Sequence, residues 1–214
     1  MFSITLTIVI ITSLISFTAF NNQKIQEDML FWPVEIDRRK QYYRFFTYGL
    51  IHADWIHLLF NMMALYSIGL YLESYLFTYP HIFGDKGKYF YLALYLSAII
   101  VSPIPDYFKH RKNYAYRALG ASGAVSAVVF AGILIKPDMG LYFMFIPFEI
   151  PGYIFGVIFL ALSAFLARKG GGNIGHGAHI TGAIYGLLFT IVATKLYSGF
   201  NAIENLIDII SRRY

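Results

Sequence analysis

Long apolar stretches alternate with shorter polar segments along the chain. The first twenty residues carry no charged side chain, and a helix needs roughly 20 residues to cross the hydrocarbon core of a bilayer. This stretch lacks the basic start and small-residue cleavage site of a signal peptide, so we expect a retained helix. The pattern predicts an all-α membrane protein with six transmembrane helices. They are expected at Met1–Phe20, Ile56–Leu76, Tyr89–Ile104, Ser122–Ile135, Ile154–Ala167 and Ala178–Leu196.

The fourth of these helices, Ser122–Ile135, is shorter than a bilayer is thick. Its 14 residues span only about 21 Å at 1.5 Å per residue, against a hydrocarbon core of roughly 30 Å. We therefore expect the rest of the protein to surround its ends. At least one end must then lie below the membrane surface.

Residues 21–51 separate the first two apolar stretches and have a different character. They are too charged to span a membrane but rich in aromatic side chains, which favour the headgroup region. We expect this segment to lie in the membrane interface. The sequence shows no internal repeat and no low-complexity stretch, so we predict one membrane domain over residues 1–214.

The composition excludes several classes of protein. With 57% hydrophobic and 14% charged residues, the chain is more apolar than a soluble domain, which has about 25% charged residues. Its net charge of +5 comes from scattered side chains, and no basic run is longer than Arg38-Arg39-Lys40. Nucleic acid binding needs a clustered basic face, so we expect no nucleic acid partner. The absence of cysteine excludes disulfides, thiolate zinc sites and a cysteine nucleophile.

The distribution of lysine and arginine bears on the orientation in the membrane. Six crossings place both termini on one side. The loops after the first, third and fifth helices hold eleven of the 17 lysines and arginines, and the opposite side holds six. The positive-inside rule alone would place the eleven in the cytoplasm.

Polar residues cluster at the starts of the second, fourth and sixth helices. These helices run in the same direction, so all three clusters reach the same side of the membrane. Polar groups in a membrane are costly and are functional candidates by default. Three helix N-termini there would also converge unpaired N–H groups that stabilise a developing anion. The clusters are His52 to Asn61, Gly120 to Gly123, and Gly175 to Gly186.

The spacing of small residues predicts which of these polar side chains meet. Gly182 and Gly186 form a small-xxx-small pair that lets another helix approach closely, and His179 lies on the same face. The fourth helix begins with small residues, so we expect it to pack there and bring Ser122 to His179. A serine becomes a nucleophile when a neighbouring base accepts its proton. His57 and Asn61, four residues apart on one helix face, can supply oxyanion donors.

Other interpretations of the same residues remain open. Gly-Ala-Ser-Gly and the paired glycines can serve packing alone. Four histidines could bind a metal, but the chain has no His-Glu-x-x-His and no cysteine, so we expect neither a metal nor another cofactor. A transporter or channel would spread its polar groups through the membrane or repeat them in two halves. The four histidines are His52, His57, His176 and His179.

Two assignments depend on helix boundaries. His176 competes with His179 for the role of base, but His176 is expected in a glycine-rich loop and His179 inside the helix. Asp54 precedes His57 by three residues, which suits a helix cap. We therefore do not expect Asp54 to be the third member of a catalytic triad.

Taken together, these motifs resemble the rhomboid family of intramembrane serine proteases from about Tyr43 to Gly186. The resemblance implies a six-helix rhomboid-type bundle with an interfacial first loop at residues 21–51 and a cap over the site at Ala167–Gly175. The motifs are His-x4-His-x3-Asn at His52, His57 and Asn61, Gly-x-Ser-Gly at Gly120 to Gly123, and Ala-His-x2-Gly-x3-Gly at Ala178 to Gly186.

The resemblance also implies roles for individual residues. Ser122 would be the nucleophile and His179 the general base of a dyad that has no carboxylate. Asn61, His57 and the Ser122 backbone N–H would form the oxyanion hole. Residues that would support the site are His52, Gly120, Gly123, Gly182, Gly186 and Arg44.

The sequence departs from the family pattern at two positions. The common Trp-Arg of the first loop is replaced by Tyr43-Arg44, and Ser126 replaces a tyrosine that in many members stacks on the base. The resemblance implies a multi-pass protein of a bacterial inner membrane, with its active site facing outward despite the charge distribution. Its partners would be the lipid bilayer and transmembrane protein substrates. The alternative is an inactive rhomboid-like protein that binds membrane proteins.

Overall fold

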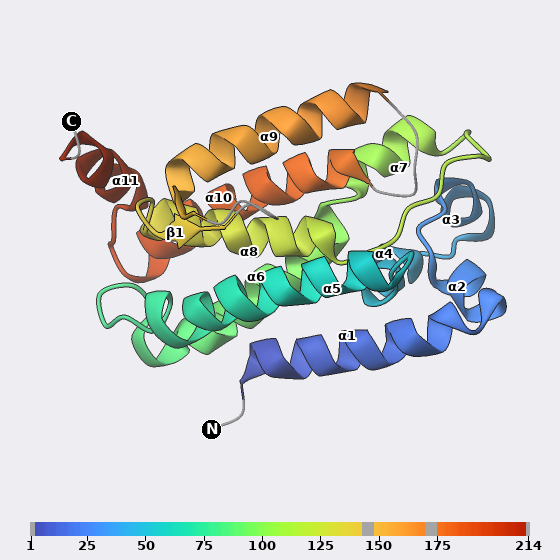
Figure 1. Ribbon diagram of the computed structural model, residues 1–214, viewed down its shortest axis with the longest axis horizontal. Helices are drawn as coiled ribbons and strands as arrows, with labels where there is room; N and C mark the ends of the chain where they lie inside the picture. Colours follow the sequence, from blue (N-terminus) through green and yellow to red (C-terminus); the bar gives the residue numbers. More distant parts are fainter. Residues whose placement is uncertain (1–2, 143–147, 170–174, 213–214) are drawn as a thin grey trace.

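The computed structural model describes residues 3–142, 148–169 and 175–212. The long helices run side by side along the longest axis of the molecule, and shorter elements gather at both ends (Figure 1). The long helices are α1 (Ile4–Phe20), α5 (Trp55–Ala64), α6 (Gly87–Val101), α8 (Ser122–Ile135), α9 (Gly152–Lys169) and α10 (His176–Tyr197). The helix that begins as α5 continues through two wider turns, η2 (Leu65–Gly69) and η3 (Leu72–Leu76).

Six apolar helices lie where the hydrophobic pattern predicts them. Among the residues that the structure describes, three stretches are long and apolar enough to cross a membrane: Trp55–Leu76, Gly84–His110 and Gly177–Tyr197. The other three are apolar but shorter: Ile4–Phe20, Ser122–Ile135 and Gly152–Arg168. The prediction of a mostly helical membrane protein is therefore confirmed.

Several predicted helix ends differ from the observed ones by one to three residues, including the end of the third helix and the start of the sixth. The third helix was expected to reach Ile104, but α6 ends at Val101 and a separate helix, α7 (Ile104–His110), follows Pro103. Proline lacks the N–H that would continue the ladder of helical hydrogen bonds. The sixth helix was expected from Ala178, with His176 in the preceding loop. Instead α10 already begins at His176.

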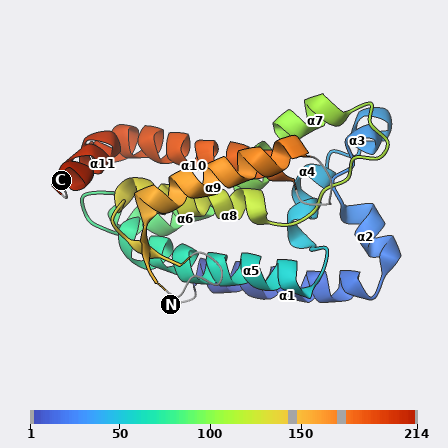
Figure 2. The same cartoon turned by 45° about the horizontal axis from the view of Figure 1, so that its top comes forward.

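The short helix α8 occupies the centre of the bundle. Every residue from Gly123 to Ile135 is buried, and α8 contacts α6, α9, α10 and the continuation of α5. Both cartoon views show it enclosed by longer helices (Figures 1 and 2). The expectation that protein surrounds this helix is therefore confirmed.

The segment between α1 and α5 folds into short helices at one end of the bundle. They are α2 (Gln23–Met29), α3 (Pro33–Arg39), α4 (Arg44–Thr47) and η1 (Tyr48–Leu50). The buried guanidinium of Arg44 donates hydrogen bonds of 2.7 Å to the carbonyls of Glu27 and Leu30. Phe31 and Ala118 exchange two backbone hydrogen bonds, of 2.9 and 3.1 Å. Arg44 thus fixes the first loop, and Phe31 ties that loop to the chain leading into α8.

The opposite end of the bundle holds α11 (Ala202–Ser211), η4 (Gly84–Lys86) and a two-stranded pairing of β1 (Gly140–Leu141) with β2 (Ile150–Pro151). The Asn205 side chain donates a 2.7 Å hydrogen bond to the carbonyl of Ile135, the last residue of α8. This contact satisfies one of the carbonyls that every helix leaves unpaired at its C-terminus.

A buried carboxylate fixes the start of α1 at this same end. Glu73 accepts hydrogen bonds of 2.8 Å from the Ser3 hydroxyl and from the backbone N–H groups of Ile4 and Thr5. Lys88 lies 3.8 Å away and supplies a positive partner. A carboxylate at a helix N-terminus interacts favourably with the positive end of the helix dipole. This interaction offsets part of the cost of burying the charge of Glu73.

Candidate active site

The three polar clusters meet at one end of the bundle. Helices α5, α8 and α10 all begin there, beside α2, α3, α4 and α7 (Figure 1). The shared direction of these helices, predicted from the order of the apolar stretches, is therefore confirmed. Their N-terminal ends carry the candidate site residues.

Ser122 and His179 are in direct contact. Ser122 is the first residue of α8 and His179 lies in the first turn of α10. The distance between Ser122 Oγ and His179 Nε2 is 2.7 Å. With Nε2 unprotonated, the hydroxyl donates to it, which is the arrangement in which a base accepts a proton from a nucleophile.

The contact depends on the close approach of α8 and α10. A Cβ added to Gly182 would collide with the backbone of Gly123, and one added to Gly186 would collide with the backbone of Ala127. Two helices can pack backbone against backbone only where side chains are absent. The predicted packing of the fourth helix on the paired glycines is therefore confirmed.

The turn before Ser122 also requires glycine. Gly120 has a φ of +113°, a region that residues with a Cβ rarely adopt. The His57 ring lies against it, with Cε1 and Nε2 only 2.6 and 2.9 Å from where a Cβ would be. Gly123 is similarly closed by the Ser102 side chain. Because Gly120 and Gly123 have no side chains, the chain can pass close to the His57 ring and the Ser102 side chain as it enters α8.

His52 holds the backbone next to the candidate nucleophile. Its side chain is fully buried, and the N–H of Ala121 donates to its Nε2 at 3.4 Å. Nδ1 must then carry the proton, which it donates to the Ser16 hydroxyl at 3.0 Å. Burial lowers the pKa of His52 to about 3, so the ring stays neutral. His52 thus connects α1 to the residue before Ser122.

The two candidate oxyanion donors lie on α5, one turn apart. The Asn61 side-chain amide donates to the carbonyl of His57 at 2.9 Å, and an amide has a second N–H to offer. Asp54 caps this helix, since its side chain accepts from the His57 N–H at 2.8 Å. The prediction that Asp54 acts as a helix cap is confirmed.

Phe159 of α9 stacks on the candidate base, a contact that the hydrophobic pattern does not predict. The rings of Phe159 and His179 have centroids 5.8 Å apart and an interplanar angle of 29°. Ser126 stands where many family members have a tyrosine, and its hydroxyl donates to the Ser122 carbonyl at 2.8 Å. An aromatic side chain from a different helix therefore packs on the imidazole of His179.

Other predicted features lie away from the dyad or outside the described residues. Arg44 organises the first loop, where its guanidinium contacts Gln41, Glu27, Leu30 and the ring of Tyr43. Residues 170–174, within the predicted cap Ala167–Gly175, lie outside the described ranges. Over the residues that the structure describes, no three histidine or acidic side chains gather closely enough to hold a metal ion.

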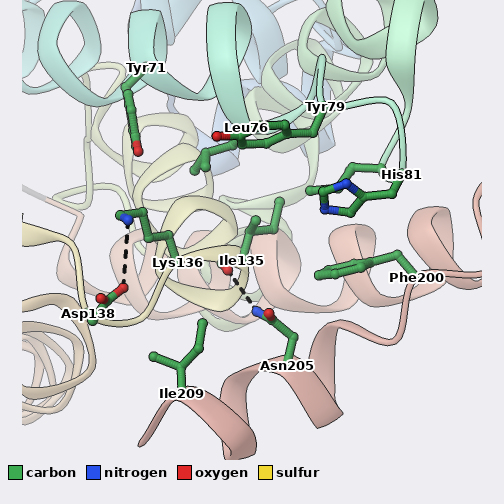
Figure 3. A pocket seen from close by; sticks show the side chains of 11 residues that line it. Tyr71, Leu76, Tyr79, His81, Ile135, Lys136, Asp138, Phe200, Asn205 and Ile209 are labelled. Carbon is green, nitrogen blue, oxygen red and sulfur yellow. Dashed lines mark hydrogen bonds and ion pairs between the residues drawn. The ribbon is translucent and has the colours of Figure 1, made fainter. Parts of the chain in front are cut away.

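A cavity of about 250 Å³ lies at the end of the bundle opposite Ser122 and His179. Figure 3 shows Lys136 and Asp138 on one side of it and His81 and Phe200 on the other. Lys136 Nζ lies 4.0 Å from Asp138 Oδ1. The cavity contains none of the predicted site residues.

Comparison with known proteins places the chain in a family. A model of the Rhomboid domain matches residues 39–196, and the chain belongs to the rhomboid family. RHOMBOID-like protein 12, mitochondrial, of Arabidopsis thaliana is 27% identical over 172 residues, which are 77% of this chain and 50% of that protein. The Rhomboid protease GlpG of Haemophilus influenzae is 24% identical over 171 residues, 78% of each chain. The chain thus spans about half the length of the plant relative.

Family membership confirms the resemblance predicted from the three motifs. Together with the apolar helices, it identifies an integral membrane protein.

Proposed function

We propose that the chain is an intramembrane serine endopeptidase, with Ser122 as nucleophile and His179 as general base. The main support is the 2.7 Å contact between their side chains, because a serine becomes nucleophilic when a base within hydrogen-bond reach accepts its proton. Membership of the rhomboid family supports it, as does the name of the bacterial relative, a rhomboid protease.

The dyad can perform both halves of peptide hydrolysis. Ser122 Oγ attacks the carbonyl carbon of the scissile bond while its proton passes to His179 Nε2. When the C–N bond breaks, His179 returns that proton to the leaving amine, and an acyl-enzyme remains. The imidazole then takes a proton from water, whose oxygen attacks the ester carbonyl. The bond between that carbon and Ser122 Oγ breaks, His179 returns the proton to Oγ, and the acid product leaves.

The negative oxygen of the tetrahedral intermediate needs donors close by. We propose that Asn61, His57 and the backbone N–H of Ser122 supply them. The start of α8 favours this assignment, because the first N–H groups of a helix have no intrahelical partner.

The substrate class is the transmembrane segment of another protein. Ser122 is half-buried at the start of a helix enclosed by longer ones, so a peptide held in the bilayer must approach from the side. A helical peptide bond is shielded by its own hydrogen bonds, and the segment must unwind before it is cut. Glycine or proline near the bond lowers that cost, by about 1 and 3 kcal/mol relative to alanine.

We propose that residues 1–214 form one domain with six elements that cross a bacterial inner membrane. The end that holds Ser122 and His179 would face away from the cytoplasm. The position of the dyad at the starts of α5, α8 and α10 supports a site near one membrane surface. One relative comes from a bacterium, while another is named as mitochondrial. The crossing elements are α1, α5 with η2 and η3, α6, α8, α9 and α10.

Covalent labelling tests the proposed function. A fluorophosphonate should label the detergent-extracted protein at Ser122, and cleavage of a transmembrane substrate should stop as labelling is completed. An inactive rhomboid-like protein would bind the substrate without reacting. The intact contact between Ser122 and His179 argues against that alternative. Absence of labelling in a folded protein that still cleaves would refute the serine mechanism.

Asn61→Ala should lower kcat by roughly 10- to 1000-fold, because one oxyanion donor contributes about 2–4 kcal/mol. KM should change little, since the donor acts on charge that develops in the transition state. Steady-state kinetics on a transmembrane substrate provide the measurement. A rise in KM at constant kcat would show that Asn61 binds the substrate instead.

A further inference from the structure

A carboxylate outside the proposed dyad lies against the helix that carries the base. Asp106 belongs to α7 and is only 8% exposed. A Cβ added to Gly177, in the first turn of α10, would be 2.5 Å from Asp106 Oδ1 and 3.1 Å from its Cγ. The carboxylate therefore packs directly on the backbone of that turn, two residues before His179.

The same carboxylate contacts the chain that leads into α8. The Tyr116 hydroxyl donates to Asp106 Oδ2 at 2.9 Å, and the ring of His110 stacks on Tyr116 with centroids 3.8 Å apart. Burial, followed by the charge of Asp106, raises the pKa of Tyr116, so the phenol remains a donor. Tyr116 precedes Ser122 by six residues, and that intervening chain enters α8 through Gly120.

A carboxylate at the start of α10 stabilises this helix. The first N–H groups of a helix lack intrahelical partners and form its positive end, where a carboxylate is stabilising. The residue before α10 is Gly175, which has no side chain with which to cap the helix. Asp106 brings a negative charge to this turn from another helix.

We propose that Asp106 is a positioning residue: it joins the first turn of α10 to the chain before α8, and so sets the distance between Ser122 and His179. The inference rests on the proposed protease function. Asp106 touches neither the substrate nor the reacting atoms. It acts through Gly177 on one side and Tyr116 on the other.

The test is Asp106→Asn, measured beside Asp37→Asn. Asp37 offers a matched control, because it accepts a hydrogen bond of 3.1 Å from Tyr107, another tyrosine–aspartate pair. Tyr107 lies on α7, as Asp106 does, but its partner Asp37 belongs to α3. The control thus removes the same chemistry at a site away from α10.

We expect Asp106→Asn to lower kcat and the rate of fluorophosphonate labelling about tenfold or more, with KM within twofold of the parent. A misplacement of about 1 Å at a reacting centre costs up to 100-fold, whereas general loss of folded protein would lower the labelled fraction rather than the rate. Asp37→Asn should leave both rates unchanged. Equal losses in the two variants, or an unchanged kcat in Asp106→Asn, would overturn the proposal.

A second variant carries the test if Asp106→Asn does not fold. Tyr116→Phe keeps the carboxylate and removes only its link to the chain before α8, and we expect the labelling rate to fall at least threefold. An unchanged rate would overturn the proposal. Ser122→Ala distinguishes failure of the proposed function from failure of the positioning role. If Ser122→Ala still cleaves, the proposed function is wrong. If it is inactive while Asp106→Asn is normal, only the positioning role is wrong.

Discussion

Ser122→Ala and His179→Ala should each lower cleavage of a transmembrane substrate by about 10⁴-fold or more, and the double variant should be no worse than either. Nucleophile and base act as a unit, so removing one already removes what the other contributes. The 2.7 Å contact between the two side chains is the physical basis of this expectation. The measurement is the initial rate of cleavage by detergent-extracted protein at equal folded concentration.

The controls are Ser198→Ala and His81→Ala, which remove the same side chains at the end of the bundle opposite the dyad. Ser198 follows α10, and His81 lines the distant cavity. Both variants should cleave at the parental rate. Full activity in Ser122→Ala, or additive losses in the double variant, would show that another group attacks the peptide bond.

The sequence predicts the helices because apolar length and spacing encode them locally. The bounds of α8, Ser122–Ile135, agree with the prediction at both ends: Gly120, with its positive φ, lies just before the helix, and Lys136-Pro137 follow it. The pairing of α8 with α10 follows from the absence of side chains at Gly182 and Gly186. His176 was misplaced because glycines on both sides of it favour a loop, although the helix already starts there.

What the sequence does not predict are contacts made by side chains from distant helices. Phe159 is one apolar residue in an apolar helix, and nothing in the pattern marks it as facing the imidazole rather than lipid. Asp106 and Tyr116 lie ten positions apart in a mostly polar segment, residues 106–117, and nothing in the pattern pairs them. Their partnership depends on the path of the loop between α7 and α8, which periodicity does not determine.

Position 126 shows why such contacts matter. Many family members have a tyrosine there that stacks on the base, whereas this chain has Ser126. From the sequence, the missing ring leaves the orientation of His179 undetermined. In the structure, α9 supplies Phe159 at 5.8 Å from the imidazole, and the Ser126 hydroxyl is bound to the Ser122 carbonyl. In this chain the aromatic neighbour of His179 therefore comes from α9 and not from position 126.

Gly182→Val should inactivate the protein by separating its helices, with Ser122 and His179 both still present. A single Cβ at this position already collides with the backbone of Gly123, and backbone cannot move aside as a side chain can. The two added methyl groups of valine should force α10 away from α8. Because reacting groups must be held to within about 1 Å, we expect cleavage and fluorophosphonate labelling to fall by at least 100-fold.

The same substitution should lower thermal stability, since overpacking costs roughly 1–3 kcal/mol and sometimes more. Leu188→Val is the matched control: it places the same side chain on α10 at a position that is 55% exposed. It should retain its cleavage rate and melting temperature. Gly182→Ala should fall between the parent and Gly182→Val, because it adds the colliding Cβ without the branches. Parental activity and melting temperature in Gly182→Val would mean that α8 and α10 do not pack here, and the distance between Ser122 and His179 would then need another explanation.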